Sequence, residues 1–116
     1  MTVSRADQRI AVLAFAAQNP AMTVGVLRVR FALPSRTLKE KRAIVKSVVE
    51  RLRTRFNASI AEVDDLDNPA VACIGAACLS SEGAHAGAQL QAIADAIQEW
   101  RLDAEVLDIE TELIAV

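Results

Sequence analysis

The chain has 116 residues, of which 53% are hydrophobic and 24% are charged, and its aromatic side chains are three phenylalanines and one tryptophan. This length supports one domain with one modest hydrophobic core, and this composition excludes a chain that is disordered throughout. No apolar run approaches the ~20 residues that a transmembrane helix requires, so we expect no contact with a membrane.

The net charge of −2 conceals a strong asymmetry along the chain. Between Arg28 and Arg55 there are ten basic and two acidic residues, whereas from Glu62 to the end there are twelve acidic residues and one basic residue. The first segment therefore carries about +8 and the second about −11. Such a chain has the charge to bind a polyanion on one side, but its two halves can equally neutralise each other when they pack together.

Residues 1–21 end in a turn-forming NPA sequence. We expect them to be an extension outside the domain, and we expect residues 22–116 to fold as one domain without them. The apolar run at residues 10–17 resembles the core of a secretory signal peptide, but it is short and Asp7 interrupts the basic start. The two cysteines suit buried thiols in a reducing compartment, so a cytoplasmic location is favoured.

The first element expected within the domain is a strand at residues 23–33, which Pro34 ends. A period of two along this segment predicts one buried and one open face. The buried face carries Leu27, Val29, Phe31 and Leu33, and the open face carries Val26, Arg28, Arg30 and Ala32.

A helix is expected next, because Thr37 and Glu40 have the spacing of a capping box. It extends to about Phe56, and its apolar residues fall within one arc when successive residues turn by about 100°. These residues are Leu38, Val45, Val48, Val49, Leu52 and Phe56.

Two strands, a second helix and a last strand follow. The strands are expected at residues 58–63 and 71–79, separated by a polar loop, and the second helix starts near Ser80 and Ser81, whose hydroxyls can cap it. Residues 106–113 alternate as a last strand. The order βαββαβ with right-handed crossovers predicts a ferredoxin-like α+β sandwich, with strand order 4-1-3-2, both helices on one face and the other face open.

The expected helix at residues 38–56 carries a stripe of cations beside its apolar arc. Lys39, Arg42, Lys46 and Arg53 lie within about 60° of arc, and Lys41 is near the start of the same helix. These five residues are candidates for RNA binding, since a stripe of about 21 Å is long enough to follow several phosphates. The alternative is an ordinary solvated face, but cations near a helix start oppose the helix dipole, so stability does not explain them.

Arg28 and Arg30 lie on the open face of the sheet, where an RNA platform is conceivable. Such a platform stacks bases on exposed aromatic side chains, and residues 71–79 contain none. The last strand is expected beside the first, so cross-strand ion pairs are the better explanation for both arginines. The expected acidic partners are Asp108, Glu110 and Glu112.

No set of residues predicts catalysis, a metal site or a cofactor. Asp64, Asp65 and Asp67 lack the glycine and distal glutamate of a calcium loop, and His85 has no nucleophile with which to pair. Cys73 and Cys78 are five positions apart in one strand, on opposite faces, and cannot form a disulfide with each other. We therefore expect a protein that is not an enzyme and that holds neither metal nor cofactor.

Two motifs carry a resemblance to a known family. The chain reads TLKEKR at residues 37–42 and RFNASIAEVD at residues 55–64. With them, residues 22–114 resemble the YlxP-like family of small bacterial proteins of unknown function. The resemblance implies a ferredoxin-like fold and a cytoplasmic location without an established activity. It also implies a connection with ribosomal RNA, because family members are often encoded near translation genes.

Two hypotheses for function result from the sequence. In the first, a cytoplasmic protein contacts RNA or a ribosomal particle through its basic first helix. In the second, the chain is a protein-interaction or regulatory module that forms a homodimer through the open face of its sheet, where Val26 and one side of residues 71–79 leave apolar surface.

Overall fold

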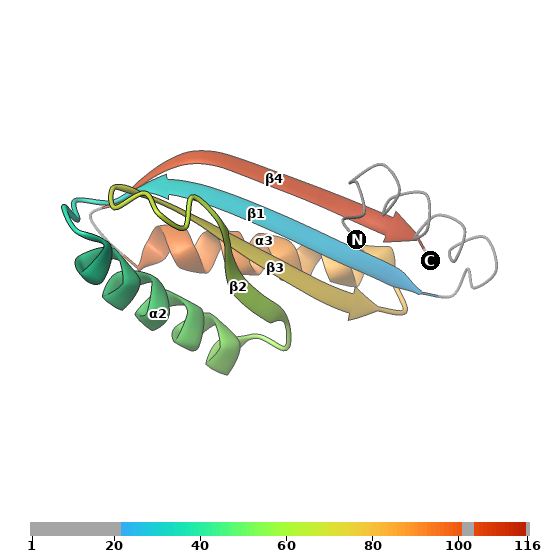
Figure 1. Cartoon of the computed structure of the whole chain (residues 1–116). Helices are drawn as coiled ribbons and strands as arrows, with labels where there is room; N and C mark the ends of the chain where they lie inside the picture. Colours follow the sequence, from blue (N-terminus) through green and yellow to red (C-terminus); the bar gives the residue numbers. More distant parts are fainter. Residues whose placement is uncertain (1–21, 101–103, 116) are drawn as a thin grey trace, which may run out of the picture.

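The structure is a computed structural model, and it describes residues 22–100 and 104–115 (Figure 1). Residues 1–21, which we expect to form an extension, lie outside the described residues. The boundary predicted at Met22 therefore stays a prediction.

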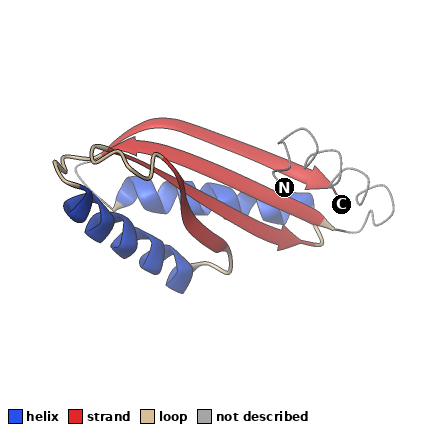
Figure 2. Ribbon diagram, in the orientation of Figure 1, coloured by secondary structure: helices blue, strands red, loops and turns tan. Residues whose placement is uncertain are grey.

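The described chain forms one four-stranded antiparallel sheet and two helices in the order βαββαβ. The elements are β1 (Thr23–Ala32), α2 (Leu38–Arg55), β2 (Ser59–Asp64), β3 (Val71–Ser80), α3 (Gly83–Glu99) and β4 (Glu105–Ala115). The strand order is β2-β3-β1-β4, and both helices cover the same face of the sheet (Figure 2). The ferredoxin-like fold and the strand order predicted from the sequence are thus confirmed.

The hydrophobic core lies between the sheet and the helices. Alternate residues of β1 provide its centre, since Leu27, Val29 and Phe31 are buried while Val26 on the opposite face is exposed. Residue 25 is a glycine because α3 passes close to β1 at this point: a Cβ atom there would lie 3.0 Å from Leu90 Cδ1.

The start of α2 follows the predicted cap with one difference. The Thr37 hydroxyl accepts a hydrogen bond from the Glu40 amide at 3.1 Å, as expected. The Glu40 carboxylate, however, accepts from the amide of Arg36 and not from that of Thr37. The helix ends at the predicted place, where the Phe56 amide donates to the Leu52 carbonyl.

The start of α3 differs from the expected serine cap. Glu82 is the capping residue, and its side chain makes no capping hydrogen bond. The Ser80 hydroxyl accepts from the Glu82 amide, one residue before the helix, and so orders the turn that leads into it. Ser80 therefore supports the turn and not the first helical amides.

A β-bulge interrupts β4 near its start. The register moves from Arg30 opposite Asp108 to Phe31 opposite Val106, which leaves Leu107 as the extra residue. Val106 consequently shares the helix-facing side with Phe31, although strict alternation predicts it on the open side. Alternation fails here because one added residue reverses the side on which all preceding residues lie.

Candidate nucleic-acid interface and its surroundings

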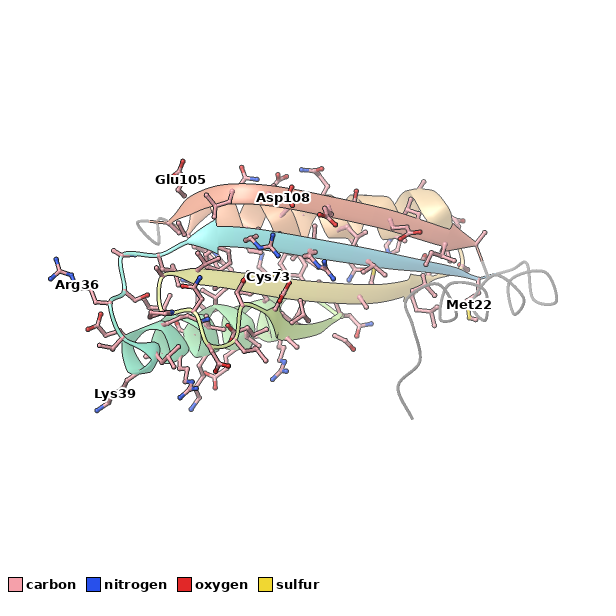
Figure 3. All side chains as sticks on the ribbon, turned by 45° about the horizontal axis from the view of Figure 1, so that its top comes forward. Met22, Arg36, Lys39, Cys73, Glu105 and Asp108 are labelled. Atoms are coloured by element: carbon pink, nitrogen blue, oxygen red, sulfur yellow. The ribbon has the colours of Figure 1, made fainter. Side chains whose placement is uncertain are left out.

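The exposed cations of α2 lie where the sequence predicts them. Lys39, Arg42, Lys46 and Arg53 are all exposed, and Figure 3 shows the Lys39 side chain pointing away from the sheet. Across residues 22–100 and 104–115, no carboxylate lies within 4.0 Å of Lys39, Arg42 or Lys46. These three cations are therefore solvated charges without an ion-pair partner in the described part of the chain.

Lys41, by contrast, lies inside the protein, with 0% of its surface exposed. Its Nζ atom donates to the backbone carbonyls of Asp65 at 2.5 Å, Asn68 at 2.7 Å and Val71 at 3.0 Å. Glu62 Oε2 lies 3.0 Å from the same nitrogen. An ammonium group has three hydrogens, so the carbonyls take them and the carboxylate mainly balances the charge.

This burial corrects the prediction that Lys41 is one of five RNA-binding candidates. A buried ammonium group that is surrounded by carbonyls has no access to an external phosphate. Its role is to hold the loop between β2 and β3, in which Asp65 adopts a positive φ of 55°. The sequence contains the relevant signal, because Lys41 falls inside the apolar arc of the helix, between the directions of Val45 and Val48.

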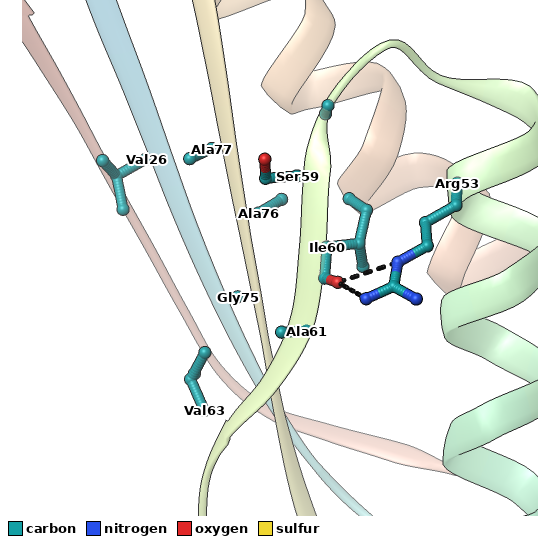
Figure 4. A pocket seen from close by; sticks show the side chains of 10 residues that line it. Val26, Arg53, Ser59, Ile60, Ala61, Val63, Gly75, Ala76 and Ala77 are labelled. Carbon is teal, nitrogen blue, oxygen red and sulfur yellow. Dashed lines mark hydrogen bonds between the residues drawn. The ribbon is translucent and has the colours of Figure 1, made fainter.

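Arg53 is exposed but also has a structural contact. Its Nε and Nη2 atoms donate to the Ile60 carbonyl at 3.1 and 2.7 Å, as the dashed lines in Figure 4 show. Ile60 belongs to β2, an edge strand of the sheet. This contact places the cation stripe on the flank of α2 that faces β2, and it uses two of the five N–H donors of Arg53, which leaves three for a ligand.

Arg30 corrects a second prediction. The register does place Arg30 opposite Asp108 and Arg28 opposite Glu110, on the same face of the sheet. The guanidinium of Arg30 nevertheless turns the other way, and it contacts Asp65 at 2.9 Å and Asp64 at 3.1 Å. The loop after β2 folds over the sheet and competes successfully with β4 for this arginine.

The carboxylates of Asp64 and Asp65 both bind Arg30, and neighbouring groups affect the pKa of Asp64. The backbone amide of Asp65 donates to the Asp64 carboxylate at 2.8 Å, and this bond is the main cause that lowers the pKa of Asp64. Burial opposes this effect and is the second-largest cause, and the charges of Arg30 and then Arg28 lower the pKa further. Both carboxylates are thus already engaged with protein groups, which accounts for them without a bound cation.

The open face of the sheet is apolar and hollow above β2 and β3. Gly75 and Ala77 of β3 lie at the floor of a shallow groove of about 630 Å³, which Val26 and Val63 border. Gly75 leaves the room that the Val63 side chain occupies, since a Cβ atom at residue 75 would lie 2.8 Å from Val63 Cγ1. The groove contains no aromatic side chain, so it lacks the stacking surface of an RNA-binding sheet.

The other residues considered for catalysis or metal binding, two cysteines and one histidine, do not form a common site. Cys73 faces the open side and Cys78 the helix side; both are buried free thiols, as predicted, and burial raises the pKa of Cys73. His85 is exposed on α3. Within the described residues, no group of three or more His, Cys, Asp or Glu side chains is arranged to hold a metal ion, and no helix is long and apolar enough to span a membrane.

The comparison with protein families gives a match along most of the chain. Residues 24–111 match the model of a family described as "Protein of unknown function (DUF503)". The chain belongs to this family. The match includes β1 except its first residue, both helices, β2, β3 and the first part of β4, and therefore the site residues discussed above.

No curated protein matches the chain. Solved structures that are similar to this chain include a de novo designed protein, Foldit4. It is 14% identical in sequence to this chain with a TM-score of 0.47, and the alignment covers 78% of this chain and 96% of Foldit4. Another is an amidase of the hydantoinase/carbamoylase family from Burkholderia phymatum, with 14% identity and a TM-score of 0.45. That alignment covers 83% of this chain and 28% of the amidase.

Proposed function

We propose that this member of the DUF503 family contacts RNA, alone or in a ribosomal particle, through the exposed cations of α2. The single observation that carries the proposal is that Lys39, Arg42 and Lys46 are exposed on one flank of the helix without a carboxylate within 4.0 Å among the described residues. A row of unpaired cations is the type of surface that binds a phosphate backbone.

Folding stability gives no reason for these positions. Lys39 and Arg42 lie in the first turns of α2, where the partial positive charge of the helix terminus disfavours cations. The nearby cations that do serve the fold behave differently. Lys41 is buried against carbonyls, and Arg51 on the opposite flank stacks over Trp100 with its Cζ atom 4.0 Å from the ring centre.

The proposed RNA contact is tested by the triple variant Lys39→Gln, Arg42→Gln, Lys46→Gln. A second triple variant, Arg36→Gln, Arg51→Gln, Arg55→Gln, removes the same total charge from other exposed positions and serves as the matched control. Because Arg51 also stacks on Trp100, circular dichroism first verifies that this control is folded. Binding to RNA is measured by fluorescence anisotropy, and binding to ribosomal particles by co-sedimentation. Both are measured at salt concentrations between roughly 50 and 200 mM, because contacts to phosphates weaken strongly over this range.

We expect the first variant to lose affinity and to lower the slope of log affinity against log salt by up to ~1 unit for each cation removed. The control should retain most of both. If the two variants lose affinity equally, the binding follows net charge and the assignment to α2 is wrong. If the parent chain binds no RNA even at 50 mM salt, the proposed function is wrong.

A second candidate function is a homodimer formed through the open sheet face. It is favoured by the exposure of Val26 and Val63, which line the groove, and of Leu79, which lies further along β3. Analytical ultracentrifugation of the full chain tests it, with Val26→Lys as the variant. A dimer that Val26→Lys dissociates would support this candidate, whereas a monomer at high concentration would contradict it.

A further inference from the structure

We propose that the outer edge of β4 is a docking site for an extended segment of another protein, in which basic and apolar residues alternate. The segment would add as a further antiparallel or parallel strand to the sheet, beside β4. This inference concerns a different surface from the cations of α2 and does not depend on them.

The first observation is that β4 forms a long regular edge. Within the described part of the chain its only strand neighbour is β1, so the backbone groups on its other side have no strand partner. After the bulge at Leu107, residues 108–115 pair with residues 23–30 without interruption. Eight such residues extend about 27 Å, which is ample for strand addition.

The second observation is the chemistry of the two sides of this edge. Asp108, Glu110 and Glu112 alternate on the open side of the sheet. On the helix-facing side, Ile109 is 40% exposed and Leu113 is 49% exposed, because the helices cover β1 and β3 more fully than they cover β4. A strand beside β4 therefore meets carboxylates on one side and apolar side chains on the other.

The third observation is that Arg30 does not neutralise the acidic side. It is held by Asp64 and Asp65 on the far side of β1, although the register places it opposite Asp108. Arg28 lies opposite Glu110, and these two residues form no ion pair within 4.0 Å. Asp108 and Glu110 thus keep negative charge that a basic partner would complement.

A second copy of the chain does not fit this edge. When two β4 strands pair antiparallel about a two-fold axis, the two sheets become continuous and their open faces lie on the same side. Even-numbered residues of one β4 then pair with even-numbered residues of the other, and odd-numbered with odd-numbered. Every register that overlaps the strand centres then sets a carboxylate opposite another, for example Asp108 opposite Glu112 or Glu110 opposite itself. Like charges in directly opposed positions destabilise a sheet, so the occupant must differ from β4 in charge.

The required pattern follows from the period of two. A docked strand presents every second side chain to Asp108 and Glu110, and these should be lysine or arginine. The intervening side chains lie beside Ile109 and Leu113, and these should be apolar. The backbone hydrogen bonds give affinity that does not depend on sequence, while the alternation selects the partner.

The test uses three synthetic nine-residue peptides with the full chain. The first alternates lysine and valine, the second has the same composition in a blocked order, and the third alternates glutamate and valine. Binding is measured by fluorescence anisotropy, and the site is located by NMR shifts of backbone amides. We expect the alternating lysine peptide to bind at least tenfold more tightly than either control and to shift the amides of residues 108–115.

Two variants assign the charge. Asp108→Asn with Glu110→Gln should weaken binding of the alternating lysine peptide three- to tenfold, whereas the control Glu99→Gln, an exposed acid of α3, should leave it unchanged. Circular dichroism verifies that each variant is folded, and the single variant Glu110→Gln replaces the pair if it is not. The proposal is overturned if the blocked peptide binds equally well, if the shifts lie outside β4, or if those β4 amides that point away from β1 are already protected from hydrogen exchange in the chain alone.

Discussion

The two edge strands of this sheet, β2 and β4, differ in how far other parts of the described chain cover them. β2 has 6 residues and β4 has 11, and both carry an isoleucine on the side that faces the helices. Ile60 in β2 is 2% exposed, whereas Ile109 in β4 is 40% exposed. The Ile60 carbonyl is taken by Arg53, and the loop after β2 is held by Lys41. No comparable contact covers β4 within the described residues.

In the described part of the chain, the β2 edge is thus covered by side chains of α2, whereas the β4 edge has no strand partner beyond β1. Unpaired edges are sites of association that natural proteins usually shorten, bend or cover. β2 is short, is irregular near Val63 and has a side chain from α2 along it. Among residues 22–100 and 104–115, charged side chains are the only evident protection of β4, and such charges select partners as well as repel copies.

The largest expected effect on stability concerns the hydrogen bonds from Lys41 to the loop that follows β2. Lys41→Met should lower the free energy of unfolding by about 3–5 kcal/mol, because it leaves the partly buried Glu62 without a counter-charge and several carbonyls without a donor. Urea denaturation measures the change. Lys39→Met, on the exposed side of the same helix, should change stability by less than about 0.5 kcal/mol. Equal effects of the two substitutions would contradict the structural role assigned to Lys41.

The two isoleucines give a direct comparison of the edges. Ile60→Ala should cost about 2–4 kcal/mol, since it leaves a cavity under β2. Ile109→Ala should cost less than about 1 kcal/mol, because its side chain is already partly solvated. Thermal and urea unfolding of both variants test the contrast. A large loss of stability for Ile109→Ala would mean that this side of β4 is covered in solution.

Arg53 should have an intermediate effect on the β2 edge. Arg53→Met removes the donors to the Ile60 carbonyl, and a hydrogen bond of this kind contributes about 1 kcal/mol. Lys46→Met serves as the matched control, because Lys46 lies on the same flank and has no ion-pair partner among the described residues. Hydrogen exchange of the β2 amides should accelerate in the Arg53 variant alone. Unchanged exchange in that variant would show that α2 does not fasten this edge.

The smallest expected effect is electrostatic and involves the loop after β2. The pKa of Asp64 is lowered in the folded chain, so its contribution to stability is present above the pKa of the unfolded state, about 4, and is lost as the pH falls through the lower folded value. Arg30→Gln should raise the pKa of Asp64 only part of the way, because the Asp65 amide causes most of the shift. An NMR titration of the carboxyl carbon measures this change. A complete return to the ordinary value would assign the shift to Arg30 instead.

Much of the fold could be predicted because it depends on local patterns. The period of two in residues 23–33, the capping box at Thr37 and the apolar arc of the first helix are all properties of neighbouring residues, and they specify which side of each element is buried. The exposure of Lys39, Arg42 and Lys46 follows from the same periodicity. The sequence alone thus determined the order of the elements, the sheet topology and the candidate cation stripe.

Only the tertiary structure decided the partners of the charged residues and the state of the two edges. Lys41 donates to a carbonyl 24 residues away along the chain, and Arg30 donates to a carboxylate 35 residues away. The charge of a side chain indicates the type of partner it can bind. Which partner lies near it at such a separation depends on the fold. The bulge at Leu107 reversed the side on which Val106 lies. The unequal cover of β2 and β4 likewise depends on where the helices come to rest, because burial is a property of the packed layers and not of a strand by itself.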